Sequence, residues 1–242
     1  MKTLKLWLVP AAFYAVTCFL NLYGCMIDGP LERYVKPALL PLLCVTTLAY
    51  LLSCPENPLT REGGLSAKYA CLLITGQLFG YAGDTMLMGK GFAFFAGGIG
   101  MFLVGHLFYI CLFGGISWKG LKAWQWALAL LCMIGATAGL IYGIGVNGTM
   151  LAPMGIYGFV LTLLIFSGLA GVLRPGKVAL GSRCTWWIIL VGALLFTFSD
   201  ALIAVRNFGH LSPFMDGFGV MSTYLAAQTL LAIGGIRLIR KK

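Results

Sequence analysis

Long apolar runs dominate the sequence, and polar residues gather in the short segments between them. A helix that crosses a membrane needs roughly 20 apolar residues, because the hydrocarbon core is about 30 Å thick and each residue rises about 1.5 Å. Eight runs meet this requirement: 4–23, 37–53, 67–88, 92–116, 123–143, 150–173, 184–205 and 217–238. They are solidly apolar and do not alternate, so they predict helices and not the strands of a transmembrane barrel.

Composition supports this class of protein. Hydrophobic residues make up 60% of the chain and charged residues 10%, and the mean hydropathy is +0.93. These values lie outside the range of soluble globular proteins. We therefore expect an all-α fold: a polytopic integral membrane bundle of eight transmembrane helices, forming one transmembrane domain over residues 1–242.

The net charge of +10 could suggest a nucleic-acid partner, but the distribution of the charges argues against one. Of the 17 Lys and Arg residues, 13 fall on the N-terminal side of the predicted bundle, and only four fall on the other side: Arg33, Lys36, Lys90 and Arg206. This asymmetry is the positive-inside bias of membrane proteins. It predicts that both termini are cytoplasmic and that the number of spans is even.

Two acidic residues, Asp84 and Asp200, fall inside predicted spans, whereas the other five lie in loops. A carboxylate in the hydrocarbon core costs at least a few kcal/mol, so such a residue is a functional candidate by default. The alternative is a structural role, in an ion pair or a hydrogen-bonded network.

The predicted topology brings these acids to one depth. Runs 67–88 and 184–205 cross in the same direction, so Asp84 and Asp200 both lie about one turn below the outer boundary. Lys36 opens the run 37–53 from that face, and Tyr224 and Gln228 lie one turn apart near the start of the run 217–238. We therefore expect a polar chamber in the outer half of the membrane.

Residues three, four and seven positions apart share a helix face, and two such polar stripes are present: Gln77, Tyr81 and Asp84 in one, and Phe102, His106 and Tyr109 in the other. A lone membrane histidine such as His106 is equally consistent with a packed structural residue. Small residues spaced by four predict close helix packing at two places: Gly76 with Gly80, and Gly135 with Gly139 and Gly143.

The chain has two histidines, which excludes a zinc site of three histidines. A mixed metal site of Asp84, Asp200 and His106 is a weaker alternative, so no metal or cofactor is expected.

The segment LFGYAGDTMLM resembles ALLFTFSDALIA four spans later. This echo suggests two parallel four-helix halves, about 1–116 and 117–242, an arrangement common in transporters.

Taken together, several motifs resemble those of the YhhN-like membrane family, whose characterised members are lysoplasmalogenases. The motifs are Lys36-Pro37, Gly83-Asp84, FFAGGIGMFLVGHLFY ending at Tyr109, GALLFTFSD ending at Asp200, and YLAAQ from Tyr224 to Gln228. They occur in order along nearly the whole chain. The GYAGD stretch departs from the Ser-Leu-x-Gly-Asp form of the family, although its Gly-Asp core is present.

The resemblance implies hydrolysis of the vinyl-ether bond of a lysophospholipid, an alkenyl-glycerophosphoethanolamine or -choline, to a fatty aldehyde and a glycerophospho-headgroup. Such a bond is cleaved by protonating its β-carbon, which gives an oxocarbenium ion that water attacks. The reaction needs one protonated and one ionised carboxyl group, and two acids in a low-dielectric site divide in this way. A glycosidase carboxyl pair does related work.

On this hypothesis Asp84 and Asp200 are the catalytic pair, with either one as the acid. Lys36 binds the phosphate, and Tyr81, His106, Tyr109, Tyr224 and Gln228 orient the acids, the water or the substrate. The main alternative is a proton-coupled carrier of a small or lipid-like solute, because paired intramembrane acids also relay protons. A third hypothesis is a non-enzymatic membrane scaffold, in which both aspartates are structural. Short loops favour a bacterial plasma membrane over an internal eukaryotic one. The sequence specifies no oligomeric state.

Overall fold

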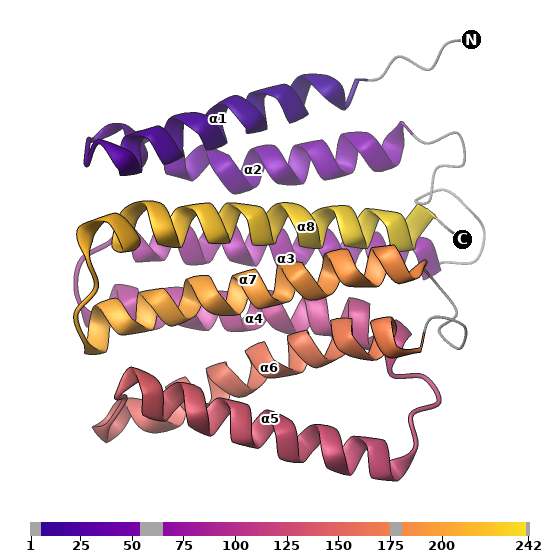
Figure 1. Ribbon diagram of the computed structural model, residues 1–242. Helices are drawn as coiled ribbons and strands as arrows, with labels where there is room; N and C mark the ends of the chain where they lie inside the picture. Colours follow the sequence, from indigo (N-terminus) through magenta and orange to yellow (C-terminus); the bar gives the residue numbers. More distant parts are fainter. Residues whose placement is uncertain (1–5, 54–64, 175–180, 241–242) are drawn as a thin grey trace. The chain divides into compact units, whose positions relative to one another are not determined.

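The protein is described by a computed structural model over residues 6–53, 65–174 and 181–240, in which every regular element is helical (Figure 1). Eight α-helices follow one another: α1 (Leu8–Met26), α2 (Leu31–Leu52), α3 (Leu65–Leu87), α4 (Phe92–Ser117), α5 (Ala123–Ile144), α6 (Leu151–Leu173), α7 (Arg183–Phe208) and α8 (Val220–Arg240). A 3-10 turn (η1, Gly148–Met150) precedes α6 and a π-turn (η2, Met215–Gly219) precedes α8. The all-α prediction is confirmed for these residues.

Helix α2 begins at Leu31, so the prediction that a helix opens at Lys36-Pro37 is wrong. An apolar run marks the part of a helix that suits hydrocarbon, whereas the backbone bonds of the helix continue into the polar residues before it. Pro30 occupies the N-cap, and Pro37 lies inside the helix. Because proline has no N–H group, it offers no hydrogen bond to the carbonyl one turn earlier.

Seven of the eight described helices are long and apolar enough to cross a membrane, and α3 is the exception. Helix α3 contains Lys68, Gln77 and Asp84, and these residues lower its mean hydropathy. Gln77 and Asp84 are nevertheless buried inside the protein. The chain is therefore an integral membrane protein with at least seven apolar helices, and the crossing by α3 stays a prediction.

The chain divides into two compact units, which are described one at a time. The first comprises Met1–Leu112 and Ala232–Lys242, and the second comprises Phe113–Leu231. Figure 1 shows α1 and α2 side by side in the first unit, and the beginning of α1 and the end of α8 at the same end of it. The basic residues Lys2, Lys5, Arg61, Lys177, Lys241 and Lys242, which support the predicted topology, lie outside the described residues.

In the first unit, α3 and α4 pack closely because glycines of one helix meet bulky residues of the other. A Cβ atom on Gly76 would lie 2.6 Å from the ring of Tyr109, and one on Gly83 would lie 2.9 Å from the ring of Phe102. A Cβ on Gly105 would lie 3.0 Å from the carbonyl oxygen of Gly76. The prediction of close packing at this glycine face is confirmed.

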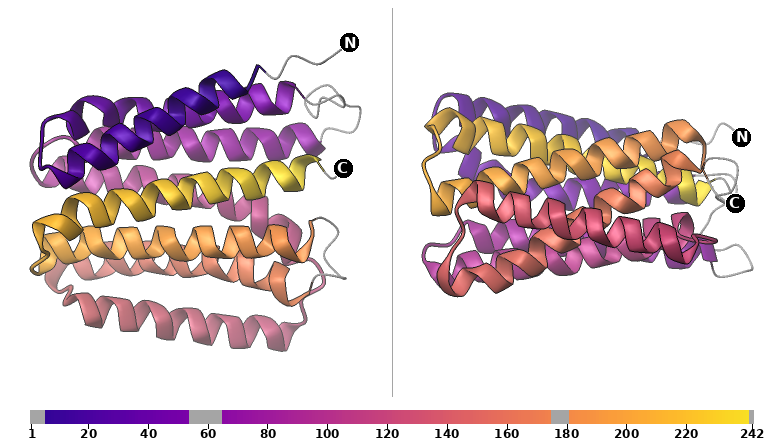
Figure 2. Two further views of the ribbon diagram at one scale, coloured as in Figure 1. Left: turned by 45° about the horizontal axis from the view of Figure 1, so that its top comes forward. Right: turned by 60° about the horizontal axis from the view of Figure 1, so that its bottom comes forward.

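In the second unit, α6 packs against both α5 and α7, and the last turns of α6 approach α7 closely. A Cβ on Gly168 would lie 2.8 Å from the Cα of Leu190, so only glycine fits there. Figure 2 shows α5 and α6 from two further sides. The glycines of α5 behave differently: Gly135, Gly139 and Gly143 have no described atom within 4 Å of an added Cβ. The packing prediction is wrong for this stripe, because spacing alone does not fix which face of a helix meets a neighbour.

Candidate active site

Asp84 lies in the last turn of α3 and is 4% exposed. The preceding residue, Gly83, is the glycine that packs against the ring of Phe102 on α4. Because a larger residue would push the two helices apart, Gly83 fixes how closely this carboxylate approaches α4. Gly83 therefore has a packing role at this end of α3.

A hydrogen bond between α2 and α3 sets the level of Lys36. The amide nitrogen of Gln77 donates to the hydroxyl of Thr47 at 3.1 Å, and both residues are buried. Along two antiparallel helices this pairing brings Lys36 to the level of Met88, about one turn or 6 Å beyond Asp84. Lys36 is half-buried and lies near the level at which α3 ends.

The predicted stripe Phe102–His106–Tyr109 forms a buried face of α4, with exposed fractions of 4%, 1% and 2%. The Nδ1 atom of His106 lies 2.6 Å from the carbonyl oxygen of Phe102, one turn earlier in the same helix. Since a carbonyl only accepts, Nδ1 is the donor of this hydrogen bond. Tyr81 belongs to the other predicted stripe, on α3, where it lies about one turn before Asp84. Its side chain is half-buried.

In the second unit the carboxylate of Asp200 accepts a hydrogen bond from the hydroxyl of Tyr157. Asp200 lies on α7 and Tyr157 on α6, and they are 8% and 5% exposed. Both line a small cavity of about 30 Å³, together with Thr197 and apolar residues of α5, α6 and α7. A water molecule needs a space of about 10–15 Å³ on this measure and two to four polar partners, so the cavity has room for one beside the carboxylate.

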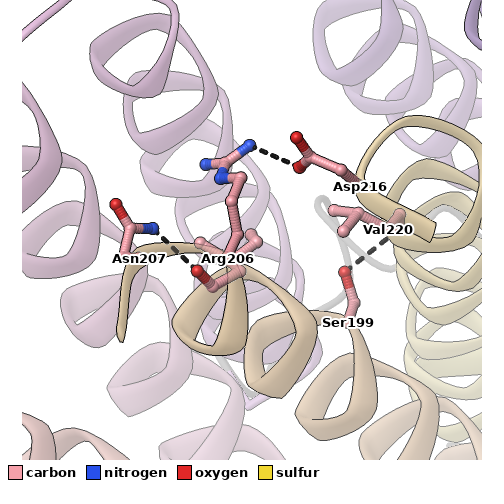
Figure 3. A network of polar contacts seen from close by, with 6 residues as sticks. Ser199, Arg206, Asn207, Asp216 and Val220 are labelled. Carbon is pink, nitrogen blue, oxygen red and sulfur yellow. Dashed lines mark hydrogen bonds and ion pairs between the residues drawn. The ribbon is translucent and has the colours of Figure 1, made fainter. Parts of the chain in front are cut away.

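The start of α8 is joined to α7 next to Asp200. The hydroxyl of Ser199 donates to the carbonyl of Val220 at 3.1 Å (Figure 3). One turn further along, the rings of Phe196 and Tyr224 meet edge to face with centroids 5.4 Å apart. The side-chain amide of Gln228 donates to the hydroxyl of Tyr224 at 3.3 Å. Tyr224 and Gln228 thus form one hydrogen-bonded pair on a face of α8 that packs against α7.

The turn between α7 and α8 is tied at the surface as well. Arg206 forms an ion pair with Asp216 at 3.0 Å, and Asn207 donates to the carbonyl of Ile203 at 2.7 Å (Figure 3). The side chains of the ion pair are 39% and 38% exposed. An ion pair this exposed contributes less than about 1 kcal/mol, so it shapes the turn more than it stabilises the protein.

The structure thus gathers the predicted residues into two groups, one in each unit. Lys36, Tyr81, Asp84, His106 and Tyr109 belong to the first, and Asp200, Tyr224 and Gln228 belong to the second.

Sequence reasoning missed Tyr157, which lies in the apolar run 150–173. The signal was the presence of a tyrosine within an apolar run, because a buried phenol hydroxyl usually has a hydrogen-bond partner. The described residues contain no group of three or more His, Cys, Asp and Glu residues that could hold a metal ion.

These observations define a class: an α-helical membrane protein with buried carboxylates in two of its helices. Within that class, the chain belongs to the YhhN family, whose model matches residues 31–235. The match extends from the start of α2 into the last turns of α8 and includes the helices that carry both aspartates.

The chain is also similar to several curated mammalian proteins. It is 29% identical to lysoplasmalogenase TMEM86B of Rattus norvegicus in an alignment of 238 positions that covers 88% of this chain and 91% of the relative. It is 30% identical to lysoplasmalogenase TMEM86B of Mus musculus, over 96% of this chain and 87% of the relative. With lysoplasmalogenase TMEM86A of Bos taurus the identity is 28%, over 71% and 68%. No solved structure matches the chain.

Proposed function

We propose that this protein is a membrane hydrolase that cleaves the vinyl-ether bond of lysoplasmalogens. The observation that carries the proposal is the similarity, over 88% of the chain, to a protein named as a lysoplasmalogenase. The reaction converts an alkenyl-glycerophospholipid and water into a fatty aldehyde and a glycerophospho-headgroup. The substrate is an amphipath with one chain, which suits an enzyme whose helices are themselves apolar.

Asp84 and Asp200 are the proposed catalytic acids. One protonates the β-carbon of the vinyl ether, and the double-bond electrons form the new C–H bond. The other, as a carboxylate, stabilises the oxocarbenium ion and takes a proton from the attacking water. The hemiacetal that results then collapses. The glycerol oxygen takes a proton from the carboxyl group that deprotonated the water and leaves as the alcohol, while the hemiacetal hydroxyl gives its proton to the other carboxylate, which leaves the aldehyde and restores the pair. Carboxyl groups with two environments divide these tasks in other hydrolases.

The remaining side chains have proposed supporting roles. Tyr157 holds the carboxylate of Asp200 in one orientation, and the cavity beside them stores the water that attacks the cation. Lys36 receives the lipid phosphate. The pair Tyr224–Gln228, together with Tyr81, His106 and Tyr109, orients the acids and the substrate.

The proposed topology has eight crossings with both termini in the cytoplasm. The burial of Gln77 and Asp84 supports a crossing by α3, because its polar side chains avoid lipid by facing the protein. The acids then lie in the outer half of the bilayer. Short connections, such as the four residues between α1 and α2, favour a bacterial plasma membrane.

The test is mass spectrometry of the purified protein incubated with a lysoplasmalogen and, separately, with the saturated ether lysolipid. We expect aldehyde from the first lipid only. Aldehyde from neither, together with substrate uptake into proteoliposomes driven by a pH gradient, would identify a carrier instead.

The aspartates are tested by Asp84→Asn and Asp200→Asn, each of which should lower kcat/KM by at least about 100-fold, the usual contribution of a general acid or base. Asp216→Asn is the matched control, because Asp216 is exposed and paired with Arg206 at the surface. Full activity in either of the first two variants rules out the paired-acid mechanism.

A further inference from the structure

A groove runs between α5 and α6 in the second unit, away from Asp200. Its volume is about 460 Å³, within the range of about 300–1,000 Å³ that ligand sites occupy. Its walls are almost entirely apolar: Leu128, Cys132 and Ala136 of α5 face Ile165, Phe166 and Leu169 of α6. None of the residues proposed above for hydrolysis lines it.

The groove is closed at one end and open at the other. At the closed end the hydroxyls of Thr137 and Thr162 lie 3.4 Å apart, and a Cβ on Gly158 would lie 3.3 Å from Thr137. From there the two helices separate toward the start of α5 and the end of α6 (Figure 1). Trp124 and Arg174 line the groove at these helix ends. The α5 wall from Trp124 to Ala136 is about 18 Å long. That length matches one leaflet of a bilayer, whose whole hydrocarbon core is about 30 Å.

The open end is cationic. Arg174 lines it, and its guanidinium donates to the carbonyls of Ser117, Lys119 and Gly120 at 3.4, 3.1 and 3.1 Å. These carbonyls hold the guanidinium in place but carry no net charge. Lys119 is exposed in the same loop, as is Lys122, so the positive charge at this end is concentrated.

Among the described residues of the second unit, no acidic side chain lies near this end. Residues 91–199 contain no Asp or Glu, and the only acids of the second unit are Asp200 and Asp216. Asp200 lies deep in α7 and Asp216 lies in the turn after it. Arg174 instead follows the last turn of α6, where Gly171 packs against Trp186 near the start of α7. Trp118 and Trp126 meet edge to face 5.1 Å apart near this end, and Trp126 meets Phe166 of the groove at 5.5 Å. Tryptophans gather at the level of lipid headgroups.

From this we propose that the groove between α5 and α6 binds an anionic glycerophospholipid. One acyl chain lies between the helices as far as Thr137 and Thr162, and the headgroup phosphate meets Arg174, Lys119 and Lys122. On the proposed topology this end faces the cytoplasm, where leaflets carry anionic lipid. The site is separate from hydrolysis, so its failure would leave the proposed activity untouched.

Native mass spectrometry of the full-length protein tests the site, with phosphatidylglycerol and phosphatidylethanolamine of identical chains as probes. Cys132→Trp fills the groove, and Leu131→Trp is the matched control, because Leu131 is 69% exposed on the same helix and does not line the groove. We expect at least tenfold tighter binding of phosphatidylglycerol. Cys132→Trp should abolish that preference and Leu131→Trp should keep it.

A second variant, Lys119→Gln with Lys122→Gln, changes two exposed side chains and leaves the hydrogen bonds of Arg174 intact. It should lower phosphatidylglycerol binding about tenfold, and melting temperatures close to that of the parent show that both variants fold. Equal binding of the two probes, or equal behaviour of the two tryptophan variants, overturns the proposal and indicates ordinary boundary lipid. Displacement of phosphatidylglycerol by equimolar zwitterionic lysoplasmalogen also overturns it, because the groove would then be a substrate path.

Discussion

Replacing Tyr157 with phenylalanine removes one hydroxyl and leaves the ring and its packing on α6 in place. That hydroxyl donates a hydrogen bond to Asp200, and both side chains are more than nine-tenths buried. A hydrogen bond to a charged group contributes about 1.5–3 kcal/mol. If the whole of that energy serves to hold the carboxylate in its reactive orientation, kcat/KM falls by about 10- to 150-fold, since about 1.4 kcal/mol corresponds to a factor of ten.

The assay is initial-rate aldehyde release by Tyr157→Phe from a lysoplasmalogen, with Tyr142→Phe as the matched control. Tyr142 is 91% exposed on α5, so losing its hydroxyl should change nothing. We expect kcat to fall more than KM rises, because Tyr157 acts on the acid and not on the lipid. A merely structural role would lower the melting temperature and leave kcat unchanged.

A double-mutant cycle on the free energy of unfolding then tests whether Tyr157 acts through Asp200. Tyr157→Phe should destabilise the parent protein and have little further effect in the Asp200→Asn protein, since residues in contact are not additive. Full activity in Tyr157→Phe, or additive destabilisation in the double variant, would refute the reasoning.

Two further predictions concern the first unit. Gly83→Ala should destabilise the protein by about 1–3 kcal/mol, the usual cost of overpacking, because the added Cβ would lie 2.9 Å from the ring of Phe102. Gly100→Ala should not destabilise it, because no atom of the described residues lies within 4 Å of the added Cβ. Equal melting temperatures for the two variants would disprove the packing argument. Lys36→Gln should raise KM for the lysophospholipid several-fold and leave kcat nearly unchanged. Lys90→Gln is the control, at an exposed residue in the loop before α4, and should change neither constant. An unchanged KM in Lys36→Gln would show that Lys36 does not bind the phosphate.

Several features could be predicted from the sequence because they depend on composition and spacing. Long apolar runs predicted the helices, since only a helix satisfies its own backbone in hydrocarbon. The spacing of Phe102, His106 and Tyr109 predicted one buried face of α4, because helical positions three, four and seven apart share a side.

The ends of the helices, and the neighbours that each helix face contacts, were harder to predict from the sequence. The start of α2 at Leu31 was missed because hydropathy reports where a helix suits lipid and not where its hydrogen bonds begin. Equal spacings also had different outcomes: Gly76 packs against Tyr109, while Gly135 on α5 meets no described neighbour. Which face of a helix is covered depends on the helix beside it.

The sequence by itself therefore determined that this is an all-α membrane protein with two acids among apolar residues, because the cost of a charge in hydrocarbon makes Asp84 and Asp200 conspicuous without any coordinates. Only the tertiary structure decided what surrounds them. Tyr157 is 43 residues away from Asp200 in the chain, and nothing in the local pattern of α6 specifies that partner. The groove between α5 and α6 likewise exists because two helices touch at Thr137 and Thr162 and then separate, which is a property of their packing angle and not of either sequence alone.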